Sequence, residues 1–322
     1  MPIIAKSTYK PPFFLFNGHL ETIIPTFFRK VDEIQYEREI FTTSDQDFID
    51  LDWLRQDSKQ LVILFHGLEG NSRKGYIKGM AKIFFHNGWD ILAWNFRSCG
   101  GTMNKALRMY HHGEIEDTTE ILASISQKFD KIVLVGFSMG GSVILKYLGT
   151  NGSKVIPQIS KAVAISVPCS LQDSALQLNK SFNRVYRRRF IRRLLKKMEL
   201  KSIDFPDYIK FDRQQRIKTF EQFDNIFSAP MHGFKDAEEL YRNGSAINYL
   251  KGIRTPTLLI NALNDPMLTP SCFPVELARE HPYLHLEIPA RGGHVGFLDH
   301  TLKSSWVEQR ALQFVNDSSN EI

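Results

Sequence analysis

Gly136-Phe137-Ser138-Met139-Gly140 stands between two segments with different patterns of apolar residues. The β-branched apolar run at 131–135 predicts a buried strand, and residues 142–148 predict a helix that stops at Gly149. A strand, Gly-x-Ser-x-Gly and a helix form the context of a nucleophile elbow, in which glycines at 136 and 140 avoid side-chain collisions. An ordinary strand-to-helix turn is the alternative, so the choice depends on whether partners for Ser138 occur elsewhere in the chain.

The composition is that of an ordinary globular protein. The 322 residues are 43% apolar and 24% charged, which allows one or two domains. Three widely spaced cysteines form no CxxC pair, so we expect neither a zinc site nor a disulfide framework, and a reducing, cytoplasmic setting fits best. The first six residues lack the apolar run of a signal peptide, and no stretch approaches the ~20 apolar residues of a membrane span.

Strands alternate with helices along most of the chain. Residues 34–43 and 48–55 alternate apolar and polar positions around a short polar turn, which predicts an antiparallel hairpin. Apolar runs then predict strands at 61–65, 90–96, 131–135, 162–167, 257–260 and 284–288, with helices near 76–87, 115–128 and 303–315. This alternation predicts an α/β protein whose mostly parallel sheet is covered by helices on both faces.

The alternation stops between residues 168 and 251. We therefore predict a helical cap or lid at 169–250, inserted into one catalytic domain made of 31–168 and 251–322. Residues 1–30 form a separate N-terminal arm, rich in phenylalanine and proline and too broken for a long helix. The arm either packs along the body or exposes a lipid-facing patch.

The net charge of +6 is concentrated in residues 180–201, which hold ten basic residues and one acidic residue. Apolar residues recur there every four positions, which predicts one apolar face of a helix: Phe182, Tyr186, Phe190, Leu194 and Met198, with Val185 and Leu195 beside them. Such a basic helix suits an anionic membrane surface or acidic groups of a substrate. The simpler interpretation is a cap helix whose charges lie in water. No motif supports a nucleic-acid partner.

Two residues in the expected chain order are candidate partners for Ser138. Asp265 follows the strand at 257–262, and His294 follows the last strand and precedes the last helix. Gly292 and Gly293 allow the histidine loop to bend toward the serine. In the order Ser, Asp, His, the imidazole of His294 takes the serine proton, and Asp265 orients the ring and stabilises the imidazolium.

Two backbone N–H groups are candidates for an oxyanion hole. Met139 follows the nucleophile at the start of a helix, where N–H groups lack partners. The second donor should come from His66-Gly67-Leu68, directly after the strand at 61–65, and Leu68 N–H is the candidate. We interpret His66 as a structural residue that bonds the loop backbone.

Seven stretches together resemble one known family. They are PPFFLFNGHLETI at 11–23, HGLEG at 66–70, NFRSCGG at 95–101, YHHGE at 110–114, APMHGF at 229–234, NALNDP at 261–266 and GGHVGF at 292–297, with the elbow between them. With them the chain resembles the YheT-like branch of the α/β-hydrolases, esterases related to animal acylglycerol and phospholipid lipases. The resemblance implies an α/β-hydrolase fold and a triad of Ser138, Asp265 and His294. Gly18 replaces a usual proline, and Asn264 replaces a common second aspartate.

We therefore expect a serine hydrolase that cleaves lipid-like or medium-chain acyl esters through an acyl-enzyme, with no metal or organic cofactor. An alcohol acyltransferase is one alternative, because His294 and Asp299 form the H-x4-D pattern often linked to acyl transfer. A non-catalytic lipid-binding protein of the same fold is the other. We expect a small-molecule acyl ester as partner, contact of 180–201 with an anionic membrane as an option, and a cytoplasmic location, at most peripheral to the membrane.

Overall fold

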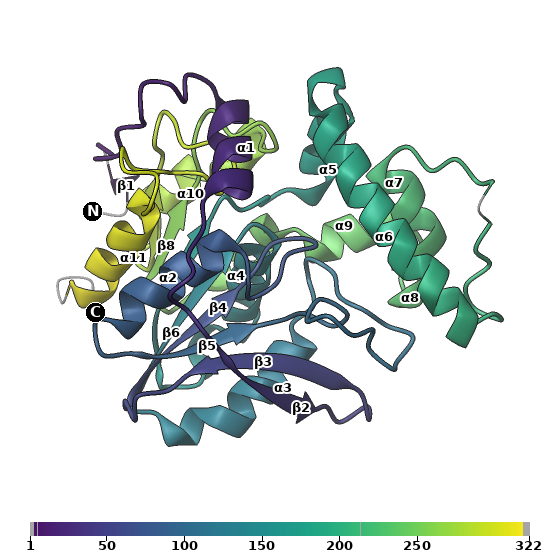
Figure 1. Ribbon diagram of the computed structural model, residues 1–322, viewed down its shortest axis with the longest axis horizontal. Helices are drawn as coiled ribbons and strands as arrows, with labels where there is room; N and C mark the ends of the chain where they lie inside the picture. Colours follow the sequence, from purple (N-terminus) through teal and green to yellow (C-terminus); the bar gives the residue numbers. More distant parts are fainter. Residues whose placement is uncertain (1–2, 5, 213, 318–322) are drawn as a thin grey trace.

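The computed structural model describes residues 3–4, 6–212 and 214–317, and its strands form one sheet (Figure 1). The strand order is β1-β9-β8-β7-β6-β4-β5-β3-β2. β3 pairs antiparallel with β2 and β5, and every other neighbouring pair is parallel. The strands are β1 Ile3–Ile4, β2 Glu37–Thr42, β3 Phe48–Leu54, β4 Gln60–Phe65, β5 Asp90–Trp94, β6 Lys131–Phe137, β7 Ile159–Ile165, β8 Thr257–Ile260 and β9 Leu284–Glu287.

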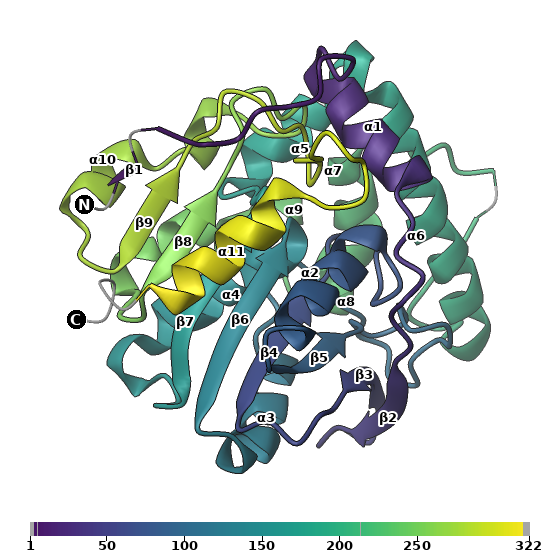
Figure 2. The ribbon, with the colours of Figure 1, turned by 60° about the vertical axis from the view of Figure 1, so that its left-hand side comes forward.

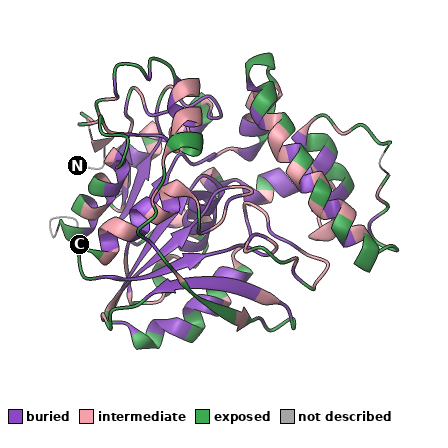
Figure 3. Cartoon of the chain, viewed as in Figure 1, coloured by how far each residue is buried: buried purple, intermediate pink, exposed green. Residues whose placement is uncertain are grey.

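Helices cover both faces of this sheet, as the alternation of elements predicts. α2 and α11 pack together on one face, and α3 and α4 lie on the other (Figure 2). β5 and β8 are buried at every position, and β4 is buried at every position after its first (Figure 3), which explains why these strands appear in the sequence as continuous apolar runs. The helices are α1 Gly18–Phe28, α2 Gly75–Phe85, α3 Glu116–Ile125, α4 Met139–Asn151, α5 Leu171–Asn179, α6 Arg184–Asp204, α7 Phe220–Phe223, α8 Ala229–Met231, α9 Ala237–Gly244, α10 Val275–Glu280 and α11 Trp306–Asn316.

The predicted end of one helix is wrong. α4 does not stop at Gly149 but continues to Asn151, and Gly152 with φ 54° follows it. Gly149 is a packing residue, since a Cβ there would lie 2.1 Å from the carbonyl oxygen of Tyr249.

The N-terminal arm is also more regular than predicted, because α1 forms 11 residues of helix with Pro25 inside it. Pro25 cannot donate a helical hydrogen bond. The side chain of Asn17 offsets part of this loss by accepting a hydrogen bond from Leu20 N–H at 2.9 Å, which caps the helix.

The segment at 169–250 carries α5 to α9 and projects to one side of the sheet (Figure 1). Of the residues predicted to form one apolar face, Tyr186, Leu194 and Met198 of α6 are buried, but Phe182 and Val185 are exposed. Phe182 lies in a 3-10 turn before α6, so the helical spacing does not apply to it. None of the helices in the described ranges has the length and apolar content that a membrane span requires.

The basic residues of α6 do not all lie in water. Lys197 Nζ is 2.6 Å from the carboxylate of Glu69, in the loop after β4. Lys201 is buried and donates to the carbonyl oxygens of Asn104, at 2.8 Å, and Ala106. One side of this helix is therefore bonded to the body of the protein, so the simple solvated-charge interpretation is wrong for that side.

Candidate active site

The turn from β6 to α4 has the geometry of a nucleophile elbow. Ser138 has φ 53° and ψ −117°, a conformation that side-chain-bearing residues rarely adopt. A Cβ at Gly136 would lie 2.5 Å from the carbonyl oxygen of Gly140, and a Cβ at Gly140 would lie 2.4 Å from that of Phe65. Glycine is thus required on both sides of the serine, by the turn itself and by the neighbouring strand.

The structure brings together the three side chains that the sequence order selects. His294 Nε2 lies 3.0 Å from Ser138 Oγ, and His294 Nδ1 lies 2.8 Å from Asp265 Oδ2. The other carboxylate oxygen of Asp265 accepts from Met267 N–H at 2.9 Å. With the proton on Nδ1, the ring donates to Asp265 and leaves Nε2 free to accept the serine proton.

Both candidate oxyanion donors lie beside Ser138. A Cβ at Gly67 would lie 3.1 Å from the Cβ of Ser138, so glycine lets this loop approach the serine closely. Within the described ranges, the backbone N–H groups of Leu68 and Met139 donate to no protein acceptor. They remain available for an oxygen atom placed next to Ser138 Oγ.

His66 has a structural role, as predicted. Its Nδ1 lies 2.8 Å from the carbonyl oxygen of Gly67, and its Nε2 accepts from Phe96 N–H at 3.2 Å. Burial lowers the pKa of His66 to about 3, so the ring is neutral and ties the loop to the neighbouring strand end.

The sequence analysis missed that α1 holds the histidine loop. Thr22 Oγ1 accepts from His294 N–H at 2.8 Å. The buried carboxylate of Glu21 accepts from Gly292 N–H at 2.9 Å and from Asn264 Nδ2 at 2.6 Å. These residues lie in the matched stretches at 11–23, 261–266 and 292–297, but their contacts join positions more than 240 residues apart, which no local pattern reveals.

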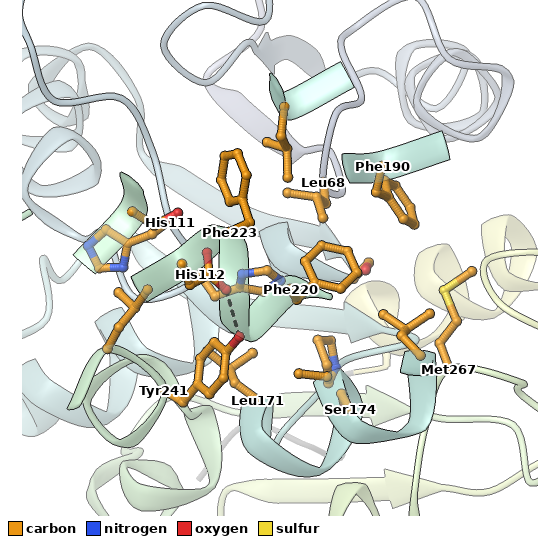
Figure 4. Close-up of a pocket in the computed structure, with 18 of the residues that line it drawn as sticks. Leu68, His111, His112, Leu171, Ser174, Phe190, Phe220, Phe223, Tyr241 and Met267 are labelled. Carbon is orange, nitrogen blue, oxygen red and sulfur yellow. Dashed lines mark hydrogen bonds between the residues drawn. The ribbon is translucent and has the colours of Figure 1, made fainter. Parts of the chain in front are cut away.

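Two cavities meet at Ser138 and His294, and both are also lined by Leu68, Phe190 and Met267. The first, which we call the apolar cavity, lies among the helices of the 169–250 segment (Figure 4). Its apolar lining comes from four helices: Leu171, Ala175 and Leu178 of α5, Phe190 and Leu194 of α6, Phe220 and Phe223 of α7, and Leu240 of α9. The second, which we call the basic cavity, lies between α1, the loop after β4 and α6. Its basic lining residues are Arg29, which is paired with Glu308 at 2.6 Å, and Lys74, Arg189 and Arg193.

Two of the histidines that line the apolar cavity, His111 and His112, are uncharged at neutral pH. Burial, with a contribution from His232, lowers the pKa of His111 well below its ordinary value, and burial lowers that of His112 to about 4. Burial also raises the pKa of Asp224 to about 6, so this carboxyl is ionised at neutral pH, and it accepts a 2.7 Å hydrogen bond from Tyr241. Apart from Asp224, the lining is uncharged and mainly apolar, which suits an apolar group.

Within the described ranges, no group of three or more His, Cys, Asp or Glu residues could hold a metal ion, and the three cysteines are free.

The fold and the site define the class of protein. The chain belongs to the alpha/beta hydrolase fold family, whose family model matches residues 60–301. Within it, the chain belongs to the branch of the provisionally named esterase YheT of Escherichia coli. The two chains are 31% identical over 304 residues, which cover 91% of this chain and 88% of YheT. The fold class and the family resemblance predicted from the sequence are confirmed.

Two further comparisons agree with this family. The monoacylglycerol lipase of Saccharomyces cerevisiae is 30% identical over 278 residues, which cover 83% of this chain and only 61% of the yeast protein. Among solved structures, the esterase Pf2001 of Pyrococcus furiosus superposes with a TM-score of 0.57 at 19% identity, covering 88% of this chain and 90% of that one. This structural likeness concerns the fold alone.

Proposed function

We propose that the protein is a serine hydrolase that cleaves carboxylic esters with Ser138, His294 and Asp265 as its catalytic residues. The observation that carries the proposal is the continuous chain of contacts from Ser138 Oγ to His294 at 3.0 Å and from His294 to Asp265 at 2.8 Å. Relatives named as an esterase and a monoacylglycerol lipase support the reaction class.

The reaction follows from this geometry. Ser138 Oγ attacks the acyl carbon while His294 Nε2 takes its proton, and Asp265 stabilises the imidazolium. The negative oxygen of the tetrahedral intermediate accepts hydrogen bonds from Leu68 and Met139 N–H. His294 then protonates the leaving alcohol, and a water molecule hydrolyses the acyl-enzyme by the same steps.

The proposed substrate is a lipid-like or medium-chain acyl ester. The apolar cavity begins at Ser138 and continues beneath α5, α7 and α9, so it can hold an acyl chain away from water. We also propose that the segment at 169–250 acts as a cap on the body formed by 31–168 and 251–322, because its helices supply most of this apolar lining.

An exposed aromatic patch near the basic cavity favours peripheral contact with an anionic lipid surface. Phe27 and Phe28 of α1 are 60% and 74% exposed, and Phe182, before α6, is 53% exposed. The patch spans two elements that contact each other, since the rings of His19 and Phe182 lie 6.0 Å apart. α6, which begins directly after Phe182 and its 3-10 turn, also carries exposed basic residues, namely Arg184, Arg188 and Arg192. Aromatic and basic groups together bind membrane interfaces.

The H-x4-D pattern gives acyl transfer no specific support. Asp299 accepts from Thr301 N–H at 2.9 Å and from the Ser304 hydroxyl, so its carboxylate shapes its own loop. Product analysis in the presence of added alcohol distinguishes hydrolysis from acyl transfer to that alcohol.

The direct test is to treat the protein and its Ser138→Ala variant with a fluorescent fluorophosphonate, followed by a series of p-nitrophenyl esters. We expect labelling and turnover in the native protein, both lost in the variant. Equal labelling of the two proteins would exclude Ser138 as the nucleophile, and no labelling of either would favour a binding protein.

A further inference from the structure

The basic residues of α6 form two rows with different surroundings. Arg184, Arg188, Arg192 and Lys196 follow one another at four-residue spacing, and all four are exposed. The second row, Arg189, Arg193, Lys197 and Lys201, has the same spacing but faces the body of the protein, and none of its members is exposed. Helical periodicity therefore separates a solvent-facing row from an inward-facing row.

The inward row divides again according to its partners. Lys197 is paired with Glu69, and Lys201 donates to backbone carbonyls. Arg189 and Arg193 instead line the basic cavity, which opens at Ser138 and His294. Lys74, directly before α2, lines the same cavity.

These three cations have no carboxylate partner. Within the described ranges, no acidic side chain lies within ion-pair distance of Lys74, Arg189 or Arg193. Glu69 is the acidic residue among those lining the cavity, and its Oε1 already accepts from Lys197 and Tyr110. Arg193 makes a long contact of 3.4 Å with the carbonyl oxygen of Glu69.

The lack of a carboxylate partner leaves three positive charges close together and partly removed from water, although the guanidinium of Arg189 lies 5.0 Å from the ring centre of Phe27. Burial first, and then the charges of Arg193 and Arg189, lower the pKa of Lys74. Burial first, and then Arg193 and Arg192, lower the pKa of Arg189. Like charges in a half-buried cavity are destabilising unless an anion neutralises them. The lining of the basic cavity therefore favours the binding of an anionic ligand.

We propose that the basic cavity binds an anionic group, a phosphate or a carboxylate, carried by the alcohol part of the ester substrate. The inference rests on the proposed function, because that function places the ester carbon at Ser138. The apolar cavity then takes the acyl chain, and the leaving alcohol points into the basic cavity. The guanidinium groups of Arg189 and Arg193 present paired N–H donors that match the oxygen pairs of phosphate and carboxylate.

The test compares two substrates that differ only in the anion: 1-octanoylglycerol and 1-octanoylglycerol 3-phosphate, both below their critical micelle concentrations. The readout is the ratio of kcat/KM for the phosphate ester to kcat/KM for the neutral ester. We expect a ratio above one in the native protein, and a fall of about tenfold or more in Arg193→Ala and in Arg189→Ala, since hydrogen bonds to charged groups are worth about that much. Arg193→Lys should fall in between, because it keeps the charge and loses the paired donors.

Lys196→Ala is the matched control, since it removes one positive charge from the exposed row of the same helix. Its ratio should equal that of the native protein. A ratio of one or less in the native protein, unaffected by Arg193→Ala, would overturn the proposal. An equal fall in Lys196→Ala would also overturn it, because the effect would then come from net charge rather than from the cavity.

Direct binding separates failure of this site from failure of the hydrolase. Calorimetry with sn-glycerol 3-phosphate and with glycerate should detect binding to Ser138→Ala and a loss of binding when Arg193→Ala is added. Binding of one ligand rather than the other identifies the anion. If no ester is cleaved but this binding is present, the anion site stands and the proposed function fails. If the neutral ester is cleaved and neither anion binds, the hydrolase stands and the anion site fails.

Discussion

The ion pair between Lys197 and Glu69 couples the 169–250 segment to the proposed oxyanion hole. Lys197 lies on α6, and Glu69 directly follows Leu68, whose N–H is a candidate donor. Glu69 has φ 55°, and its side chain is 6% exposed, against 14% for that of Lys197. Lys197→Met keeps most of the apolar volume of the side chain but leaves a buried carboxylate with Tyr110 as its remaining side-chain donor.

The magnitude follows from this burial. Removing one member of a buried ion pair costs about 3–5 kcal/mol, because the other charge is left uncompensated. Glu69→Gln should have a similar cost, since the amide can still accept a hydrogen bond but no longer neutralises the positive charge of Lys197. The double variant has no unpaired charge, so it should be more stable than the sum of the single effects predicts, by about 2–3 kcal/mol.

The assay is a double-mutant cycle in urea unfolding, combined with steady-state hydrolysis of p-nitrophenyl octanoate. We expect kcat to fall about tenfold in Lys197→Met, which is less than the loss of a whole oxyanion donor, because the N–H is displaced rather than removed. Lys196→Met, one position away and exposed, should change stability by no more than about 0.5 kcal/mol. Additive single effects, together with an unchanged kcat, would refute the coupling.

Three further predictions concern other parts of the molecule. Thr22→Val removes the acceptor of His294 N–H, so kcat for p-nitrophenyl octanoate should fall about fivefold, with KM within about twofold of the native value. Thr22→Ser keeps the hydroxyl and should restore kcat. An unchanged kcat in Thr22→Val would contradict the role of α1. Gly149→Ala should lower Tm even though alanine favours helices over glycine by about 1 kcal/mol, because its Cβ would lie 2.1 Å from the carbonyl oxygen of Tyr249. A higher Tm would show that helix propensity outweighs this steric contact. Burial raises the pKa of Asp224 in the folded protein to about 6, whereas the unfolded chain releases this proton near pH 4. Stability should therefore fall as the pH rises from 4 to 6, and Asp224→Asn should lessen the fall in Tm measured across that range. Parallel curves of Tm against pH for the two proteins would contradict this prediction.

The sequence by itself determined the order of the central strands and the candidates for the catalytic residues, but it did not predict β1, α1 or α10. The hairpin, the buried strands and the elbow follow from local periodicity and from glycine positions, which depend on neighbouring residues. The positions of Asp265 and His294 follow from chain order, because the carboxyl ends of parallel strands meet at one edge of the sheet.

Only the tertiary structure decided which residues of the same type have different roles. Arg188 and Arg189 are adjacent and chemically identical, yet one is exposed and the other lines the basic cavity. Helical periodicity assigns them to different sides of α6, but it does not reveal what lies opposite each side. The bond from Thr22 to His294 and the packing of Gly149 against Tyr249 likewise join distant parts of the chain. Such contacts depend on how whole helices and strands pack together, and that packing cannot be predicted from local sequence patterns.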